Sequence, residues 1–173
     1  MKAKGYIQVY TGNGKGKTTA ALGLALRAAG AGKKIFFAQF VKGRVYSEIK
    51  AVKKYIPEIV IKQYGLKSFI LNTPTDKDID AARKGLSEVS RIIEEGLYDM
   101  IILDEASIAI YFNLFTVSEL IAVIKNKKPG TEIVITGRNA PAELIEIADL
   151  VTEMKEIKHY YTKGVIARKG IEY

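Results

Sequence analysis

One segment of the sequence has the residue types and spacing needed to hold a chain of phosphate groups. Residues 10–19 read YTGNGKGKTT. Closely spaced glycines let backbone N–H groups turn toward phosphate oxygens, and a helix that follows adds the partial positive charge of its N-terminus. In such a P-loop Lys17 reaches the β- and γ-phosphates and the Thr18 hydroxyl ligates Mg²⁺. The predicted nucleotide-binding residues are Thr11, Gly12, Asn13, Gly14, Lys15, Gly16, Lys17, Thr18 and Thr19.

The loop departs from the usual pattern G-x-x-x-x-G-K-[ST] at one position. Thr11 stands where the first glycine belongs. We expect Gly12 and Gly14 to supply the permissive backbone instead. The alternative, a Gly-rich hairpin in a basic protein, is disfavoured because a strand, the glycines, GKT and a buried helix follow one another in the order that a P-loop requires.

Two further segments place charged groups where they could act on the same phosphates. Residues 100–105 read MIILDE, a short apolar strand that ends in two carboxylates. Asp104 is predicted to hold Mg²⁺ directly or through water, and Glu105 to orient a second ligand or water. Residues 136–139 read TGRN, and Arg138 could direct its guanidinium at the triphosphate. Taken alone, strands often end in acidic residues and loops often carry arginine, so both assignments depend on the P-loop.

The predicted secondary structure alternates between strands and helices. Strands are expected at 6–10, 34–40, 59–63, 100–103, 132–136 and 150–154. Helices are expected at 17–29, 46–55, 76–95, 117–125 and 141–147. This alternation favours an α/β fold of the RecA-like P-loop NTPase type, with a mostly parallel twisted sheet and helices on both faces. No linker or repeat divides the chain, so residues 1–173 are predicted to form a single domain, whose last twenty residues are left unassigned.

Composition restricts the chemistry. The chain has no cysteine and a single histidine, His159, which argues against thiolate chemistry, a Ser-His-Asp triad and a His-rich metal site. The net charge of +8 favours anionic partners. Basic residues are scattered rather than gathered in an aromatic-rich stripe, so no nucleic-acid partner is expected. No apolar run reaches the roughly 18 residues of a membrane span, no signal-peptide core follows the N-terminus, and a cytoplasmic location is expected.

Several segments together resemble the P-loop type of ATP:corrinoid adenosyltransferase. The matching stretches run in the family's order from residue 11 to residue 173: TGNGKGKTTAALGLALRAAG, QFVKG, LDE, ITGRNAP, ADLVTEM and KHYYTKGVIARKGIEY. The first and the last are the specific ones. The resemblance also accounts for Thr11, because the family's loop reads TGNGKGKT.

The resemblance implies transfer of the 5′-deoxyadenosyl group of ATP to the Co(I) centre of a corrinoid, with triphosphate as the leaving group, in cobalamin biosynthesis or salvage. Lys17, Thr18, Glu105 and Arg138 would then be the catalytic residues, and Thr18, Asp104 and Glu105 the magnesium ligands. The nucleotide would expose C5′ to the corrinoid, in an orientation different from that of a kinase. A flavin-type reductase that supplies Co(I) and a homodimeric state are further implications.

The corrinoid side departs from the family. The family's phrase GTGFTWNT corresponds here to residues 65–73, GLKSFILNT, in which Phe69, Asn72 and Thr73 match but Leu71 replaces the tryptophan. These residues would cover the lower face of the corrin and displace its axial ligand. Plain core packing is the alternative for Phe69 and Leu71. Glu48 corresponds to the glutamate after the family's KG motif and is a predicted corrinoid contact, and His159 is assigned either to ligand contact or to a structural role.

Two other functions share the same P-loop. A small-molecule or nucleoside kinase would release ADP instead of triphosphate, but no Arg-rich lid or acceptor motif is recognisable. A RecA-like regulatory or DNA-binding ATPase lacks room for the usual extensions in 173 residues, and a salt-sensitive DNA gel shift would support it.

Overall fold

A computed structural model of the protein describes residues 4–68, 70 and 72–173. Its centre is one six-stranded sheet in which every pair of neighbouring strands is parallel. The strands are β1 (Ile7–Thr11), β2 (Ile35–Phe40), β3 (Ile59–Tyr64), β4 (Met100–Asp104), β5 (Glu132–Thr136) and β6 (Leu150–Glu153), in the spatial order β3-β2-β4-β5-β1-β6. The predicted α/β class is confirmed, and the sheet is parallel throughout.

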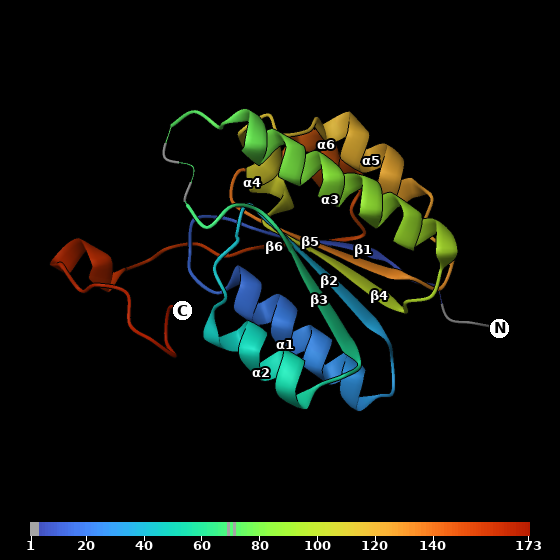
Figure 1. The fold of residues 1–173 in the computed structure, drawn as a ribbon, viewed down its shortest axis with the longest axis horizontal. Helices are drawn as coiled ribbons and strands as arrows, with labels where there is room; N and C mark the ends of the chain where they lie inside the picture. The colour runs from blue at the N-terminus through green and yellow to red at the C-terminus, as the bar shows by residue number, and fades with distance from the viewer. Residues whose placement is uncertain (1–3, 69, 71) are drawn as a thin grey trace.

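Helices cover both faces of the sheet (Figure 1). The helices are α1 (Lys17–Gly30), α2 (Ser47–Tyr55), α3 (Asp76–Glu95), α4 (Ala106–Tyr111), α5 (Val117–Lys125) and α6 (Ala142–Ile147). α1 and α2 lie on one face, and the other four helices lie on the opposite face. Capping boxes, in which a threonine and an acidic residue three positions later bond each other's backbone, begin α3 at Thr75 and α5 at Thr116. The short α4, which directly follows the Asp-Glu pair, was not predicted.

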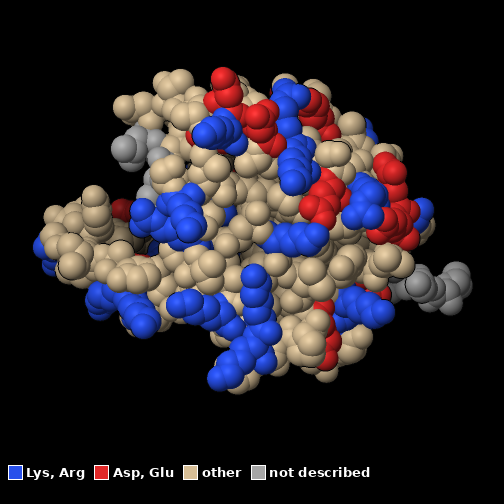
Figure 2. Space-filling model, in the orientation of Figure 1, with Lys and Arg blue, Asp and Glu red and all other residues tan. Residues whose placement is uncertain are grey.

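Charge is distributed unevenly over the surface. In the view of Figure 2, lysine and arginine predominate over the half that carries α1 and α2, whereas most acidic side chains lie over the half that carries α3. Among the described residues, no helix combines the length and the apolar character needed to cross a membrane.

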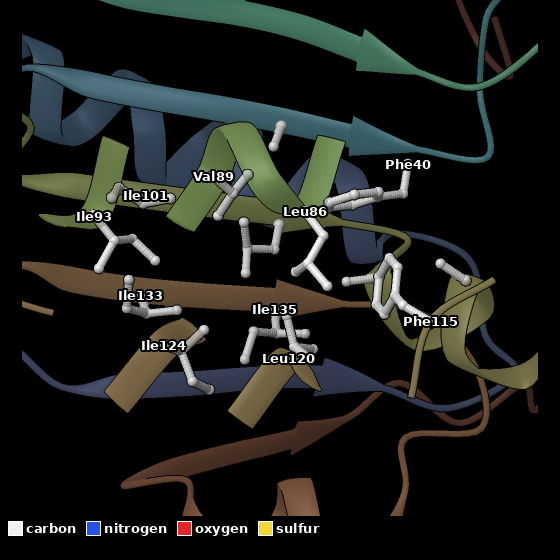
Figure 3. Close-up of a cluster of buried hydrophobic side chains, with 14 of the residues drawn as sticks. Phe40, Leu86, Val89, Ile93, Ile101, Phe115, Leu120, Ile124, Ile133 and Ile135 are labelled. Atoms are coloured by element: carbon white, nitrogen blue, oxygen red, sulfur yellow. The ribbon is translucent and has the colours of Figure 1, made fainter. Parts of the chain in front are cut away.

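The core consists of two apolar layers, one on each side of the sheet. Along β2, Phe36 and Phe40 pack under α3, whereas Ile35 and Phe37 pack on the side of α1 and α2. Figure 3 shows the first layer, where side chains of α3 and α5 meet those of the central strands. Because both faces are covered, the central strands are apolar at successive positions, as the run MIIL indicated.

The strand order brings the three predicted functional segments to one edge. β2, β4, β5 and β1 are successive neighbours, and the carboxyl ends of parallel strands meet at the same edge of a sheet. The register pairs Gln39 with Asp104 and Tyr10 with Thr136. The P-loop, the Asp-Glu pair and the TGR segment therefore lie side by side.

The chain beyond β6 forms an extension that we call the C-terminal arm, residues 155–173. It projects from the body beside the carboxyl ends of the strands and then turns back (Figure 1). Its regular structure is a single 3-10 helix, η1 (Tyr160–Lys163). Most of its residues are exposed, so the arm lacks the apolar periodicity that identifies a helix or strand from sequence.

Candidate active site

The phosphate loop connects β1 to the first residue of α1, Lys17. Gly12 and Gly16 adopt positive φ angles of 94° and 118°, in the region that favours glycine. Gly14 has no positive φ, so the expectation that Gly12 and Gly14 supply the permissive backbone is right for Gly12 and wrong for Gly14. The second permissive position is Gly16, which also caps α1.

Gly14 is a glycine for a different reason, which is the close approach of the end of β6. Its backbone N–H donates to the carbonyl oxygen of Met154 at 2.6 Å, and the Met154 N–H donates to the carbonyl of Thr11 at 2.8 Å. A Cβ atom at Gly12 or Gly14 would lie 2.5 or 2.6 Å from the same Met154 oxygen. The loop is therefore supported from outside by the edge strand.

Lys17 closes the loop from inside. Its Nζ atom donates to the carbonyl oxygens of Gly12 at 2.7 Å and Gly14 at 2.8 Å. Burial lowers the pKa of this ammonium below its ordinary value, opposed by the negative charge of Glu105. An anion arriving at the mouth of the loop would restore the electrostatic balance that burial disturbs.

Asp104 is the centre of a buried hydrogen-bond network. Its Oδ1 atom accepts from the hydroxyls of Thr18 at 2.8 Å and Thr136 at 2.7 Å. Its Oδ2 atom accepts from Gln39 Nε2 at 2.9 Å and from Lys42 Nζ at 3.2 Å. The carboxylate is fully buried, and both oxygens are used by protein donors. This geometry orients the Thr18 hydroxyl.

Glu105 and Arg138 lie at the rim of the site. Glu105 has a φ of 58°, a strained angle for a residue with a side chain, and its backbone N–H donates to the Thr136 hydroxyl at 3.0 Å. Its side chain is partly exposed, and Arg138 is exposed. Gly137, between β5 and Arg138, has a φ of 143° and no room for a Cβ atom, which would lie 2.8 Å from the Ser107 side chain.

The residues around this edge enclose a cavity of about 920 Å³. Its lining includes Gly14–Thr19, Lys42, Glu105 and Arg138, together with Glu48, Ile70 and Phe112. The predicted nucleotide residues Thr11, Gly12 and Asn13 do not line the cavity, and a direct contact of these three with ATP stays a prediction.

The C-terminal arm contributes a wall that sequence reasoning missed. His159 and residues 170–173 line the cavity. Lys15 Nζ donates to the Tyr160 hydroxyl at 3.0 Å, to the Ile171 carbonyl at 3.3 Å and to Glu172 Oε1 at 2.9 Å. Lys15, predicted to bind ATP, therefore attaches the arm to the P-loop in this structure, and its contact with ATP stays a prediction.

The very end of the arm lies against α2. Ser47 Oγ donates to the Tyr173 carbonyl at 3.0 Å, and the rings of Tyr46 and Tyr173 lie 6.3 Å apart. The structural role suggested for His159 is seen directly, because its Nδ1 atom accepts from the Tyr161 N–H at 3.0 Å and caps η1. His159 also lines the cavity, and its contact with a ligand stays a prediction.

The predicted corrinoid residues divide between two cavities. Glu48 faces the large one. Asn72 and Thr73 line a neighbouring cavity of about 450 Å³, and Phe112 is common to both. Phe69 and Leu71 lie outside the described residues.

The donor set suits Mg²⁺. Magnesium is bound in proteins by one or two carboxylates together with substrate phosphates, rather than by an all-protein cage. Thr18 and Glu105 offer oxygens at the cavity, beside Asp104. In the described part of the chain no three His, Cys, Asp or Glu side chains gather into a cage, so phosphates would have to complete the coordination.

Lys42 was not assigned a role from the sequence, although it belongs to the QFVKG stretch. Its Nζ atom lies 3.2 Å from Thr18 Oγ1, 3.2 Å from Asp104 Oδ2 and 3.3 Å from Glu105 Oε1. The feature of the sequence that could have indicated a role for Lys42 is its position just after a strand predicted from the sequence.

Comparisons with known proteins agree with this site. The sequence model of the family described as ATP:corrinoid adenosyltransferase BtuR/CobO/CobP matches residues 3–173. A "Corrinoid adenosyltransferase" of Sinorhizobium sp is 37% identical over 174 residues, 98% of this chain and 81% of the relative. The "Corrinoid adenosyltransferase" of Escherichia coli (strain K12) is 34% identical over 98% of this chain and 86% of its own length. The "Corrinoid adenosyltransferase CobA" of Salmonella typhimurium is 34% identical over 100% of this chain and 88% of its own length. With a match over almost its full length, the chain belongs to the ATP:corrinoid adenosyltransferase family.

Proposed function

We propose that this protein transfers the 5′-deoxyadenosyl group of ATP to the Co(I) centre of a corrinoid at the large cavity. The observation that carries the proposal is the shared lining: P-loop residues, Glu105 and Arg138 open into the same space as Glu48 and Phe112. A nucleotide held at the loop can thus meet a second, largely apolar substrate. The family membership supports the identity of that substrate.

The reaction requires stabilisation of a leaving group more than proton transfer. The electron pair of Co(I) forms the bond to C5′, the bond from C5′ to oxygen breaks, and its electron pair leaves on triphosphate. Lys17, the loop amides and Arg138 supply positive charge to that leaving group. No general base is needed, which fits a site built from Lys, Arg, Asp, Glu and hydroxyls.

Magnesium is part of the proposal. Thr18, Asp104 and Glu105 would hold the ion, Asp104 directly or through water, and Asp104 would also orient the Thr18 hydroxyl. When bound, the ion neutralises charge on the triphosphate. The remaining predicted contacts, Glu48, Phe69, Leu71, Asn72 and Thr73 for the corrinoid and C5′ turned toward it, belong to the same proposal.

Three aspects of the setting are proposed on chemical grounds. Co(I) must be generated by reduction, and a flavin-type reductase is the proposed donor. Residues 1–173 form one domain that acts in the cytoplasm, where ATP is available. A homodimer is proposed because the C-terminal arm exposes large apolar side chains, with Ile157 84%, Tyr161 74% and Ile166 78% exposed. Light scattering would report a monomer mass if the last proposal is wrong.

The direct test is product analysis. The protein is mixed anaerobically with ATP, Mg²⁺ and chemically reduced corrinoid, and the visible spectrum is followed while phosphate products are quantified. A light-sensitive adenosylated corrinoid and triphosphate in equal amounts are expected. Release of ADP with a phosphorylated acceptor would support the kinase alternative, and an unchanged corrinoid with ATP still bound would refute the proposed acceptor.

A further inference from the structure

The ammonium of Lys42 lies among the oxygens proposed for magnesium. The three contacts, to Thr18 Oγ1, Asp104 Oδ2 and Glu105 Oε1, measure between 3.2 and 3.3 Å. The Lys42 side chain is only 18% exposed. A protein cation therefore stands where a metal cation would be expected.

The backbone around Lys42 is held against its local preference. Val41 has a φ of 50°, and a β-branched residue in this region is strained by about 1–3 kcal/mol. A Cβ at Gly43 would lie 2.4 Å from the Gly65 carbonyl oxygen, and a Cβ at Gly65 would lie 2.5 Å from the Lys42 nitrogen. The two glycines let the chain beyond β2 lie directly against the chain beyond β3. This close packing directs Lys42 into the site.

The charges explain why the ammonium stays there. Asp104 Oδ2 and Glu105 Oε1 lie 3.2 and 3.3 Å from the Lys42 ammonium. Lys42 therefore compensates two carboxylates, one of which is fully buried and would be costly to leave without a cation. Magnesium binds oxygen at about 2.0–2.1 Å. It cannot share these three oxygens with an ammonium, because the two cations would repel each other at contact distance.

We propose that Lys42 is a tethered counter-ion that excludes divalent metal from the nucleotide-free site and admits it only together with triphosphate. The inference rests on the magnesium site of the proposed function. Lys42 lines the same cavity as Lys17, so a bound triphosphate offers its ammonium new anionic partners and releases Thr18 and Glu105 to the metal. Metal therefore enters with the nucleotide rather than before it.

Manganese provides a probe that does not depend on activity. Binding of Mn²⁺ to the full chain is measured by equilibrium dialysis and EPR, with and without ATP and in the absence of corrinoid. Wild type is expected to bind Mn²⁺ only with ATP. Lys42→Met is expected to bind Mn²⁺ alone at least tenfold more tightly than wild type, and added Mn²⁺ should raise its melting temperature but not that of wild type.

Controls separate charge from position. Lys42→Arg keeps a cation and is expected to exclude Mn²⁺ as wild type does. Lys62→Met, which breaks the surface pair between Lys62 on β3 and Glu88 on α3, is also expected to behave as wild type. If Lys42→Met proves too unstable, Lys42→Gln, which retains a donor for one carboxylate, takes its place.

The outcomes are distinct. Wild type that binds Mn²⁺ without ATP as tightly as Lys42→Met overturns the inference. So does a Lys42→Met protein that gains no metal affinity of its own, and in both cases ATP-dependent binding by wild type would leave the proposed function standing. Wild type that holds no Mn²⁺ even with ATP overturns the inference together with the proposed magnesium site.

Discussion

The carbonyl oxygen of Met154 lies 2.6 Å from the backbone nitrogen of Gly14, so the end of an edge strand supports the phosphate loop from behind. The usual account of P-loop glycines concerns only their contact with phosphate. Here two of them also have to admit a neighbouring strand, because a side chain at Gly12 or Gly14 would collide with its backbone.

Gly14→Ala should therefore damage both stability and nucleotide binding. Its Cβ would meet a backbone oxygen that cannot rotate away, and overpacking of this kind costs about 1–3 kcal/mol. The matched control is Gly23→Ala in α1, where no atom lies within 4 Å of the added carbon and helix propensity favours alanine by about 0.5–1 kcal/mol. Urea unfolding and ATP calorimetry measure both effects. Equal stability of the two variants would contradict this account of the loop.

A second prediction concerns the hydrogen-bond network around Asp104. Asp104→Asn should lower the free energy of unfolding by about 3 kcal/mol, because an amide nitrogen would face the donors that now meet a carboxylate and Lys42 would lose a buried partner. It should also reduce kcat/KM, since the disturbed network no longer holds the Thr18 hydroxyl and Lys42 in place. The exposed Asp80→Asn on α3 is the control and should change neither quantity. A stable and active Asp104→Asn protein would show that the network is dispensable.

Most of the sheet and its helices were predictable from sequence because their signals are local. The apolar run MIIL indicates a buried strand, and the apolar spacing of residues 76–95 indicates a helix. The predicted bounds of these elements match the structure to within one or two residues. α4 was missed because it is six residues long and because its N-cap is Glu105, whose φ of 58° is unusual for a residue with a side chain.

The unpredicted parts of the site depend on contacts between distant segments. Lys15 meets Glu172, Gly14 meets Met154 and Lys42 meets Asp104. A spacing rule for phosphate loops identifies Lys17. It does not cover an arm whose Glu172 lies 157 residues after Lys15, or a lysine beyond the next strand. Such pairs follow only from the strand order.

Lys17 should be needed for nucleotide binding and dispensable for folding. Burial lowers its pKa, so its charge is held at a cost in the ligand-free protein, and its bonds go to loop carbonyls. Lys17→Met should reduce ATP affinity and kcat/KM by roughly 100-fold or more, a loss of about 3 kcal/mol of leaving-group stabilisation, with a melting temperature near that of wild type. Lys33→Met, in the exposed connection between α1 and β2, should leave binding unchanged. ATP bound normally by Lys17→Met would remove this lysine from the proposed mechanism.

The attachment of the C-terminal arm should depend on one carboxylate. Arg168, Tyr160 and Lys15 hold the pKa of Glu172 well below its ordinary value near 4.5. A depressed carboxylate pKa means that the interaction is complete above the unfolded value and is lost only as pH falls through the lower folded value. Hydrogen exchange of residues 155–173 should therefore show the same protection factors at pH 8 and pH 5, with protection declining only at pH values well below 4.5.

Glu172→Gln should release the arm even at neutral pH, since a neutral amide cannot compensate the lysine and arginine that converge on it. Trypsin should then cleave within residues 155–173 several-fold faster than in wild type, and ATP affinity should fall because the arm forms a wall of the cavity. Glu156→Gln, an exposed change in the same arm, is the matched control. If both variants are cleaved at the wild-type rate, the arm is held by its apolar and backbone contacts to α2, and Tyr46 and Ser47 become the residues to change next.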